Sequence, residues 1–102
     1  MHALCRIGDL GPGEIATGTL PDGGRVAIYN VDNTFYVTAD LCTHGESSLS
    51  EEGLLDGHIV ECGWHMGQFD VRTGEPKARP CAIALRTYPV SIIDGQLHIE
   101  LD

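Results

Sequence analysis

Two short segments of the sequence contain the side chains best suited to binding a metal. One reads Cys-Thr-His at residues 42–44 and the other reads Cys-Gly-Trp-His at residues 62–65, with 17 residues between them. Thiolate sulfur and imidazole nitrogen are ligands of zinc and of iron. Four of them make a complete protein ligand set, so Cys42, His44, Cys62 and His65 are the candidate metal ligands.

The spacing of these residues distinguishes between two kinds of metal centre. A structural zinc site usually draws its ligands in pairs spaced as C-x(2–4)-C and H-x(3–5)-H, whereas here each pair is mixed and the first has one intervening residue. In a Rieske [2Fe–2S] centre two histidines replace two cysteines on one of the irons. One Cys and one His from each of two loops satisfy that arrangement. The spacing therefore favours a Rieske cluster, and a structural zinc module stays as the less favoured alternative.

The rest of the chain predicts an all-β protein whose strands position these two loops. The apolar residues recur with a period nearer two than 3.6, and glycines interrupt every stretch that could form a long helix. Residues 25–31 and 34–38 predict a hairpin around the turn Asp32-Asn33. In its first strand we expect one set of side chains to face the core and the other to face away. The inward set is Val26, Ile28 and Asn30, and the outward set is Ala27, Tyr29 and Val31.

A second hairpin and two short strands complete the predicted elements. Residues 89–93 and 96–101 flank the turn Asp94-Gly95, with Leu97, Ile99 and Leu101 expected on one face. Residues 58–61 and 67–71 predict two further strands. We therefore expect a single domain over residues 1–102, a small antiparallel sandwich or barrel with a cluster-binding subdomain inserted at approximately residues 40–72.

The charge of the chain limits its possible partners. Six basic and fifteen acidic residues give a net charge of −9, which argues against binding nucleic acid or an anionic membrane surface. Residues 26–71 contain eight acidic residues and no Lys or Arg. A partner attracted by charge should therefore be basic.

The apolar segments predict a soluble cytoplasmic protein. The longest apolar run, residues 81–85, is far shorter than the roughly 18 residues that a membrane span requires, and residues 1–6 lack the hydrophobic core of a signal peptide. In the cytosol, cysteines are kept reduced and serve more often as thiols or metal ligands than as disulfides.

The motifs resemble those of the Rieske ferredoxins of bacterial aromatic-ring-hydroxylating dioxygenase systems of the biphenyl, toluene and cumene type. The family pattern C-T-H-G followed by C-x-x-H-x-G matches residues 42–45 and 62–67, and the resemblance extends over essentially the whole chain. Residues 48–53, 69–74 and the Pro80-Cys81-Ala82 segment are similar as well. The resemblance implies the Rieske fold and one Rieske-type [2Fe–2S] cluster, held by Cys42, His44, Cys62 and His65. It also implies that both histidines bind iron through Nδ1.

The implied function is that of an electron carrier and not of an enzyme. By resemblance, a ferredoxin takes electrons from an NADH-dependent flavoprotein ferredoxin reductase and passes them to a Rieske non-haem iron terminal oxygenase. We expect a monomer, because a carrier must leave one partner to reach the next. A tightly bound redox subunit of another reductase or oxygenase complex is the alternative, because it would use the same closed ligand set.

Two positions near the second motif predict a low reduction potential. Respiratory and photosynthetic Rieske proteins place Ser and Tyr two and four residues after the second His ligand, where this chain has Gly67 and Phe69. Hydroxyl donors to the cluster sulfurs stabilise the reduced state. Without them we expect a potential near the low end of the Rieske range, which runs from about −150 to +300 mV.

Overall fold

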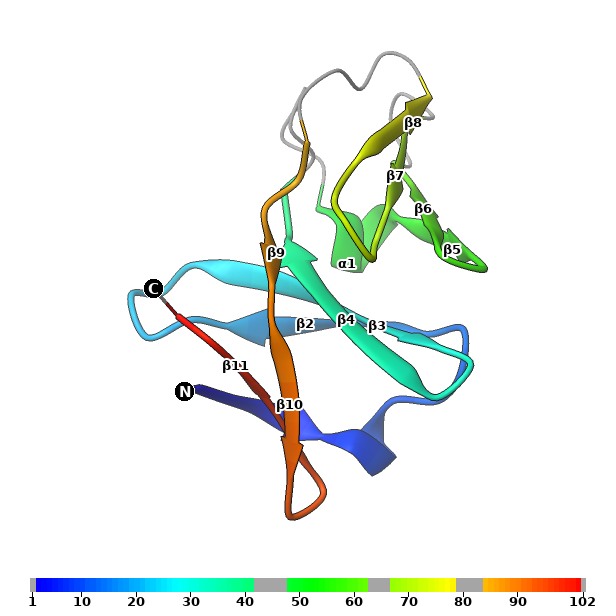
Figure 1. Cartoon of the computed structure of the whole chain (residues 1–102). Coiled ribbons are helices and arrows are strands. Elements are labelled where there is room, and N and C mark those ends of the chain that lie inside the picture. The colour runs from blue at the N-terminus through cyan, green and yellow to red at the C-terminus, as the bar shows by residue number, and fades with distance from the viewer. Residues whose placement is uncertain (1, 42–47, 63–66, 79–83, 102) are drawn as a thin grey trace.

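Three antiparallel sheets make up the computed structural model, which describes residues 2–41, 48–62, 67–78 and 84–101 (Figure 1). The first sheet has the strand order β1-β11-β10, the second β2-β3-β4-β9 and the third β5-β6-β7-β8. The strands are β1 (His2–Arg6), β2 (Ile15–Thr19), β3 (Arg25–Val31), β4 (Thr34–Ala39), β5 (Leu54–Asp56), β6 (Ile59–Glu61), β7 (Gln68–Asp70), β8 (Pro76–Ala78), β9 (Thr87–Tyr88), β10 (Val90–Ile93) and β11 (Gln96–Ile99). A 3-10 turn, Ile7–Asp9, and a one-turn helix α1, Leu49–Glu52, are the helical elements of the described residues.

Both hairpins predicted from the sequence are confirmed. Asp32 and Asn33 join β3 to β4 with φ angles of 53° and 69°. Asp94 and Gly95 join β10 to β11 with φ angles of 52° and 76°. Two consecutive residues with positive φ match the right-handed twist of the flanking strands, which explains why Asp-Asn and Asp-Gly pairs mark these turns. The predicted strands at residues 58–61 and 67–71 correspond to β6 and β7.

The prediction that one face of β3 points away from the core is wrong. Every residue from Val26 to Val31 is buried. One set of side chains, with Val26 and Ile28, packs in what we call the base core, beneath the second sheet. The other set, with Ala27 and Tyr29, packs in what we call the interface core, above it. The base core comprises Leu10, Val26, Ile28, Val37, Tyr88, Leu97 and Ile99, and the interface core comprises Ala27, Tyr29, Val31, Leu49, Val60, Cys62, Phe69, Val71 and Leu85.

The third sheet is the reason that β3 is covered on both sides. Helix α1 and strands β6 and β7 supply Leu49, Val60 and Phe69 to the interface core, so the sheet lies over the face of β3 that the sequence alone left exposed (Figure 1). Tyr29 reaches into this core, and its hydroxyl hydrogen-bonds to the Thr38 hydroxyl at 2.8 Å. Burial raises the pKa of Tyr29 well above its usual value, so the phenol stays neutral.

The segment that forms the third sheet leaves the base and returns to it at neighbouring points. Strand β4 ends at Ala39, and β9 pairs antiparallel with β4 through Val37 with Tyr88 and Thr38 with Thr87. The Ala39 amide also donates to the Arg86 carbonyl at 2.9 Å. Residues 40–86 are therefore closed at their base by backbone pairing.

Some details of the fold differ from the sequence-based expectation. The sequence does not predict strands β1, β2, β5, β8 and β9. Strand β2 contains Gly18, a residue of low strand propensity. A Cβ at Gly18 would lie 2.9 Å from the Val26 side chain, so close packing requires glycine there. The strand predicted at residues 96–101 is two residues too long at its C-terminal end. Strand β11 ends at Ile99, and Leu101 lies beyond it with 37% of its surface exposed.

A close backbone contact joins the turn after β7 to the returning chain. Gly74 adopts a φ of +79°, and a Cβ there would lie 2.1 Å from the Leu85 carbonyl oxygen. The Leu85 amide donates to the Gly74 carbonyl at 2.8 Å, and the Gly74 amide donates to the Asp70 carbonyl at 2.7 Å. The position therefore requires glycine both for its φ angle and for the space.

We expect Gly74→Ala to lower the free energy of unfolding by about 3 kcal/mol or more, since a Cβ would force two backbone segments apart and also strain φ. Gly57→Ala is the matched control, because Gly57 has a φ of +60° but open space where its Cβ would stand, with nothing beyond its chain neighbours within 4 Å. Gly57→Ala should cost about 1 kcal/mol, the strain of the left-handed conformation alone. Urea unfolding of both variants measures the difference, and equal losses would show that the Leu85 contact is unimportant.

Candidate metal centre

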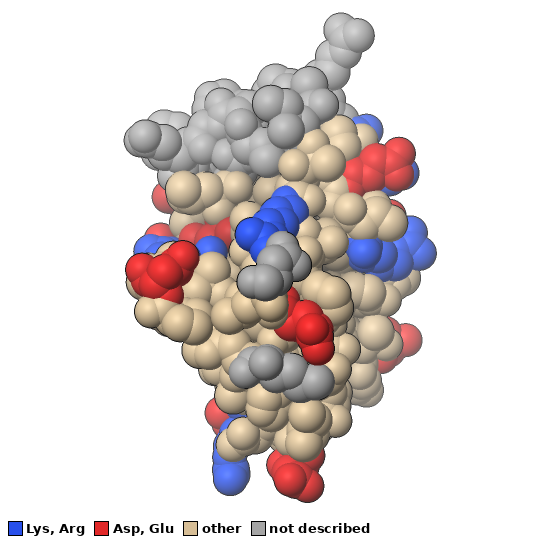
Figure 2. All heavy atoms as spheres, turned by 60° about the vertical axis from the view of Figure 1, so that its left-hand side comes forward, with Lys and Arg blue, Asp and Glu red and all other residues tan. Residues whose placement is uncertain are grey.

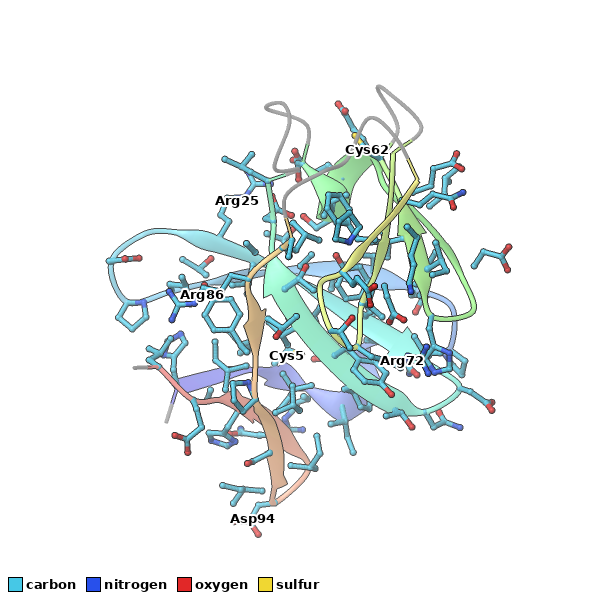
Figure 3. All side chains as sticks on the ribbon, turned by 45° about the horizontal axis from the view of Figure 1, so that its top comes forward. Cys5, Arg25, Cys62, Arg72, Arg86 and Asp94 are labelled. Carbon is cyan, nitrogen blue, oxygen red and sulfur yellow. The ribbon has the colours of Figure 1, made fainter. Side chains whose placement is uncertain are left out.

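Of the four candidate ligands, the structure describes Cys62. It directly follows β6 and is buried in the interface core with Val60 and Phe69 (Figure 3). Cys42, His44 and His65 lie outside the described residues, as does the Pro80-Cys81-Ala82 segment. The arrangement of the four ligands around one centre therefore stays a prediction, and the described residues show how the scaffold holds the ends of each motif.

The second motif begins and ends at a hydrogen-bonded pair. The Cys62 amide donates to the Gly67 carbonyl at 2.7 Å, directly beyond the pairing of Glu61 in β6 with Gln68 in β7. Residues 63–66 are therefore a short connection between two adjacent antiparallel strands. Fixing both ends of a loop removes most of the entropic cost of closing it, and the β6–β7 ladder fixes the two described ends of this segment, Cys62 and Gly67.

The first motif has a similar closed base. Leu41 and Ser48 form an isolated antiparallel bridge, and the Leu49 amide donates to the Asp40 carbonyl at 2.7 Å. Residues 42–47 span the interval between these contacts. For both motifs, the described residues that flank the segment are thus paired through the backbone.

A buried carboxylate stabilises the base of the first motif. Asp40 is almost completely buried; its Oδ2 accepts from the Ser48 hydroxyl at 2.7 Å and its Oδ1 from the Ser50 amide at 2.9 Å. Arg25 Nη2 lies 3.2 Å from Asp40 Oδ2. Burial alone would raise the pKa of Asp40, but the hydrogen bonds from Ser50 and Ser48 and the charge of Arg25 outweigh it and hold the pKa below its usual value.

The same serine begins helix α1. The Ser48 hydroxyl accepts from the Glu51 amide at 3.3 Å, as an N-cap does, and Arg25 Nη2 lies 3.3 Å from Glu51 Oε2. Arg25 and Glu51 are 44% and 63% exposed, so this ion pair adds little stability in water. Sequence reasoning missed this network. The Ser-x-x-Glu pattern at residues 48–51 is a capping signal that could have indicated the helix start.

The turn after β7 is held by a second carboxylate. Asp70 accepts from Arg72 Nη2 at 2.8 Å, from Arg72 Nε at 3.1 Å and from the Arg72 amide at 2.9 Å. These hydrogen bonds outweigh burial and lower the pKa of Asp70, so it is charged at neutral pH. The turn leads to Gly74, whose carbonyl accepts a hydrogen bond from the Leu85 amide. Leu85 comes shortly after residues 79–83 in the sequence. The hydrogen bond between Gly74 and Leu85 therefore fixes the chain just after residues 79–83.

The surroundings of Cys62 fit an iron–sulfur cluster. Its neighbours in the interface core are aliphatic and aromatic, and such burial separates a cluster from bulk solvent. Within the described ranges, no group of three or more His, Cys, Asp or Glu side chains is placed to hold a metal ion.

Comparisons with known proteins agree with this interpretation. The Rieske [2Fe-2S] domain family matches residues 1–89. Over 98 residues, 96% of this chain and 83% of its relative, the chain is 49% identical to the ferredoxin component of the p-cumate 2,3-dioxygenase system of Pseudomonas putida. The solved ferredoxin of Sphingomonas yanoikuyae B1 superposes with a TM-score of 0.92 at 42% identity, covering 98% of this chain and 97% of that one. A chain from a complex of reduced oxygenase and oxidised ferredoxin in carbazole 1,9a-dioxygenase gives a TM-score of 0.90 at 38% identity, covering 98% and 95%.

The chain belongs to the Rieske [2Fe–2S] domain family. The predicted all-β Rieske fold is confirmed, and the cofactor is a Rieske-type [2Fe–2S] cluster. Because its relatives are ferredoxins, the chain is an electron carrier and not the catalytic component of a system. None of the helices in the described ranges is long and apolar enough to cross a membrane.

We expect Ser48→Ala to lower the free energy of unfolding by about 2–4 kcal/mol, because it removes the cap of α1 and a hydrogen-bond donor to the buried Asp40. Ser91→Ala is the control, since Ser91 lies in the edge strand β10, outside both cores. It should change stability by about 0.5 kcal/mol or less. Chemical denaturation measures both, and a Ser48→Ala loss as small as that of Ser91→Ala would contradict the role given to this network.

Proposed function

We propose that this chain is the ferredoxin component of an aromatic-ring dioxygenase system. It would accept electrons from an NADH-dependent flavoprotein ferredoxin reductase and deliver them to a Rieske non-haem iron terminal oxygenase. The observation that carries the proposal is the scaffold at the two motifs, where backbone pairing closes the base of each loop and Cys62 is buried at the end of β6. The similarity to the p-cumate system ferredoxin over 96% of the chain supports the choice of partners.

We further propose that Cys42, His44, Cys62 and His65 hold the cluster. When bound, the cluster stores and releases one electron. The chain's part is to keep one Cys and one His on each of two loops whose bases are fixed. Strands β6 and β7 do this for the second motif, and the Asp40 network does it for the first.

We also propose that residues 1–102 form one domain with a cluster-binding unit at approximately residues 40–72, to which β8 adds a further strand. The pairing of β4 with β9 supports an insertion, because it brings the two ends of the inserted segment together. We place the protein in the cytoplasm as a monomer, where reductase, oxygenase and NADH are accessible to a carrier that must exchange partners.

The chain should restore electron flow between a reductase and an oxygenase. With NADH and the reductase and terminal oxygenase of the Pseudomonas putida p-cumate system, product formation should depend on adding this chain, and the chain alone should form no product. Cys62→Ser and His65→Ala should abolish both iron content and coupling, because each removes a proposed ligand. Iron analysis and product quantification measure the two effects.

Cys5→Ser and His98→Ala are the controls for these variants. Cys5 lies in β1 and His98 in β11, both in the first sheet and outside the two motifs. Both variants should keep their iron and their coupling. The Pseudomonas putida ferredoxin is the positive control for reduction by NADH and the reductase. The proposed function would be contradicted if that ferredoxin were reduced while this chain, loaded with its cluster, was not.

The reduction potential should be near the low end of the Rieske range, and Phe69→Tyr should raise it. Phe69 is buried in the same core as Cys62, so a hydroxyl there is a candidate donor to the centre. Phe35→Tyr adds the same hydroxyl to the other phenylalanine of the chain, which packs against the base core, and should leave the potential unchanged. Protein-film voltammetry measures all three proteins; a clearly positive wild-type potential, or equal shifts in the two variants, would contradict this explanation.

A further inference from the structure

The outer face of the third sheet differs from its inner face. Side chains alternate along short strands, so Leu55, Val60 and Phe69 point into the interface core. Helix α1 lies on that inner side, between the third sheet and the base (Figure 1). The opposite side chains form an open groove of about 320 Å³, lined by Leu54, Asp56, Ile59, Glu61 and Gln68. Leu54 is 65% exposed, the largest exposed fraction among the large apolar side chains of the described residues.

The groove combines apolar contact area with negative charge. In the β5–β6 register, Leu54 lies opposite Glu61 and Asp56 lies opposite Ile59, so each carboxylate stands beside an apolar side chain. Gln68 Nε2 donates to Glu61 Oε2 at 3.1 Å, which orients that carboxylate without neutralising it. None of the described Lys, Arg or His residues lines the groove.

The described Lys and Arg residues from β5 to β8 are paired with carboxylates outside the groove. Arg72 pairs with Asp70 at 2.8 Å and Lys77 with Glu75 at 3.5 Å, both toward β7 and β8. On the side of the molecule that Figure 2 brings forward, basic and acidic side chains are interspersed. Among the residues that the structure describes, the groove is therefore lined by two carboxylates and by no Lys or Arg.

The position of the groove links it to the proposed cluster site. Glu61 directly precedes Cys62, and Leu54 lies across from Glu61. A protein that packs on Leu54 and Ile59 would thus lie beside the strand end that carries a proposed ligand. The other exposed leucine next to a motif, Leu41, shares its groove with Arg25, so that surface lacks the same purely acidic character.

We propose that this groove is the docking surface for a redox partner that presents Lys or Arg side chains around an apolar contact. The proposal rests on the proposed function and adds where the partner binds. The two carboxylates speed encounter with a basic surface, and their effect falls with ionic strength. Leu54 supplies apolar area that slows dissociation and is insensitive to salt.

Cytochrome c, a basic haem protein, is the probe for this surface. The reduced, cluster-loaded chain is mixed with oxidised cytochrome c in a stopped-flow instrument, and the second-order rate constant is measured from low to high salt. Asp56→Lys should lower the rate about tenfold at low salt and flatten its salt dependence, because it replaces attraction by repulsion. Leu54→Ser should lower the rate severalfold while keeping the salt dependence of the wild type.

Asp94→Lys is the matched control, since it makes the same charge change in the β10–β11 turn, at the end of the molecule opposite Cys62 (Figure 3). It should change the rate less than twofold. Equal effects of Asp56→Lys and Asp94→Lys, or no effect of Leu54→Ser, would overturn the docking surface. So would a change in oligomeric state in Leu54→Ser, measured by sedimentation, because the groove would then be a contact between copies of this chain.

Two further measurements separate this inference from the proposed function. The reduction potential of each variant should equal that of the wild type, which shows that the rates report docking and not driving force. Reduction of the same variants by NADH and the p-cumate system reductase tests whether the electron donor uses the groove too. If the wild type is reduced normally while the groove variants match the control, the docking surface fails and the carrier function stands.

Discussion

The packing of the third sheet on β3 is the interaction on which the rest of the structure depends. Strand β3 is buried on both faces, so it belongs at once to the base core and to the interface core. Separating the third sheet from the base would expose Tyr29, Phe69, Val60 and Leu49 together, at roughly 1.5–3 kcal/mol for each large apolar side chain. Because Cys62 lies in that same core, the packing that joins the two parts also positions the proposed ligand.

Backbone contacts at the ends of three connecting segments add to this packing. The bridge between Leu41 and Ser48, the bond between Cys62 and Gly67, and the contact between Gly74 and Leu85 each fix the ends of a short connecting segment. The buried Asp40 supports the first of them through Ser48 and Arg25. A carrier needs such rigidity because its centre must change charge with little rearrangement. The groove proposed for partner docking is built on the same strands, β5 to β7, but none of its lining residues is a proposed cluster ligand.

Sequence reasoning succeeded where a short signal determines the outcome. The Asp-Asn and Asp-Gly turns predicted both hairpins, since positive φ angles select those residues. The mixed Cys and His spacing indicated the cofactor, because few centres take such a ligand set. Tertiary contacts could not be predicted from the sequence. The residues of β3 give no sign that a distant segment covers Ala27 and Tyr29, and the residues around Asp40 give no sign that Arg25 pairs with it. Strands β8 and β9 are too short for any periodicity to appear.

Metal and labile sulfide analysis, combined with electron paramagnetic resonance of the dithionite-reduced protein, tests most directly whether Cys42, His44, Cys62 and His65 hold a Rieske centre. Membership of the Rieske family predicts two iron and two sulfide per chain, with the low average g-value of mixed histidine and cysteine ligation. Zinc in place of iron, or the signal of an all-cysteine [2Fe–2S] cluster, would contradict that assignment.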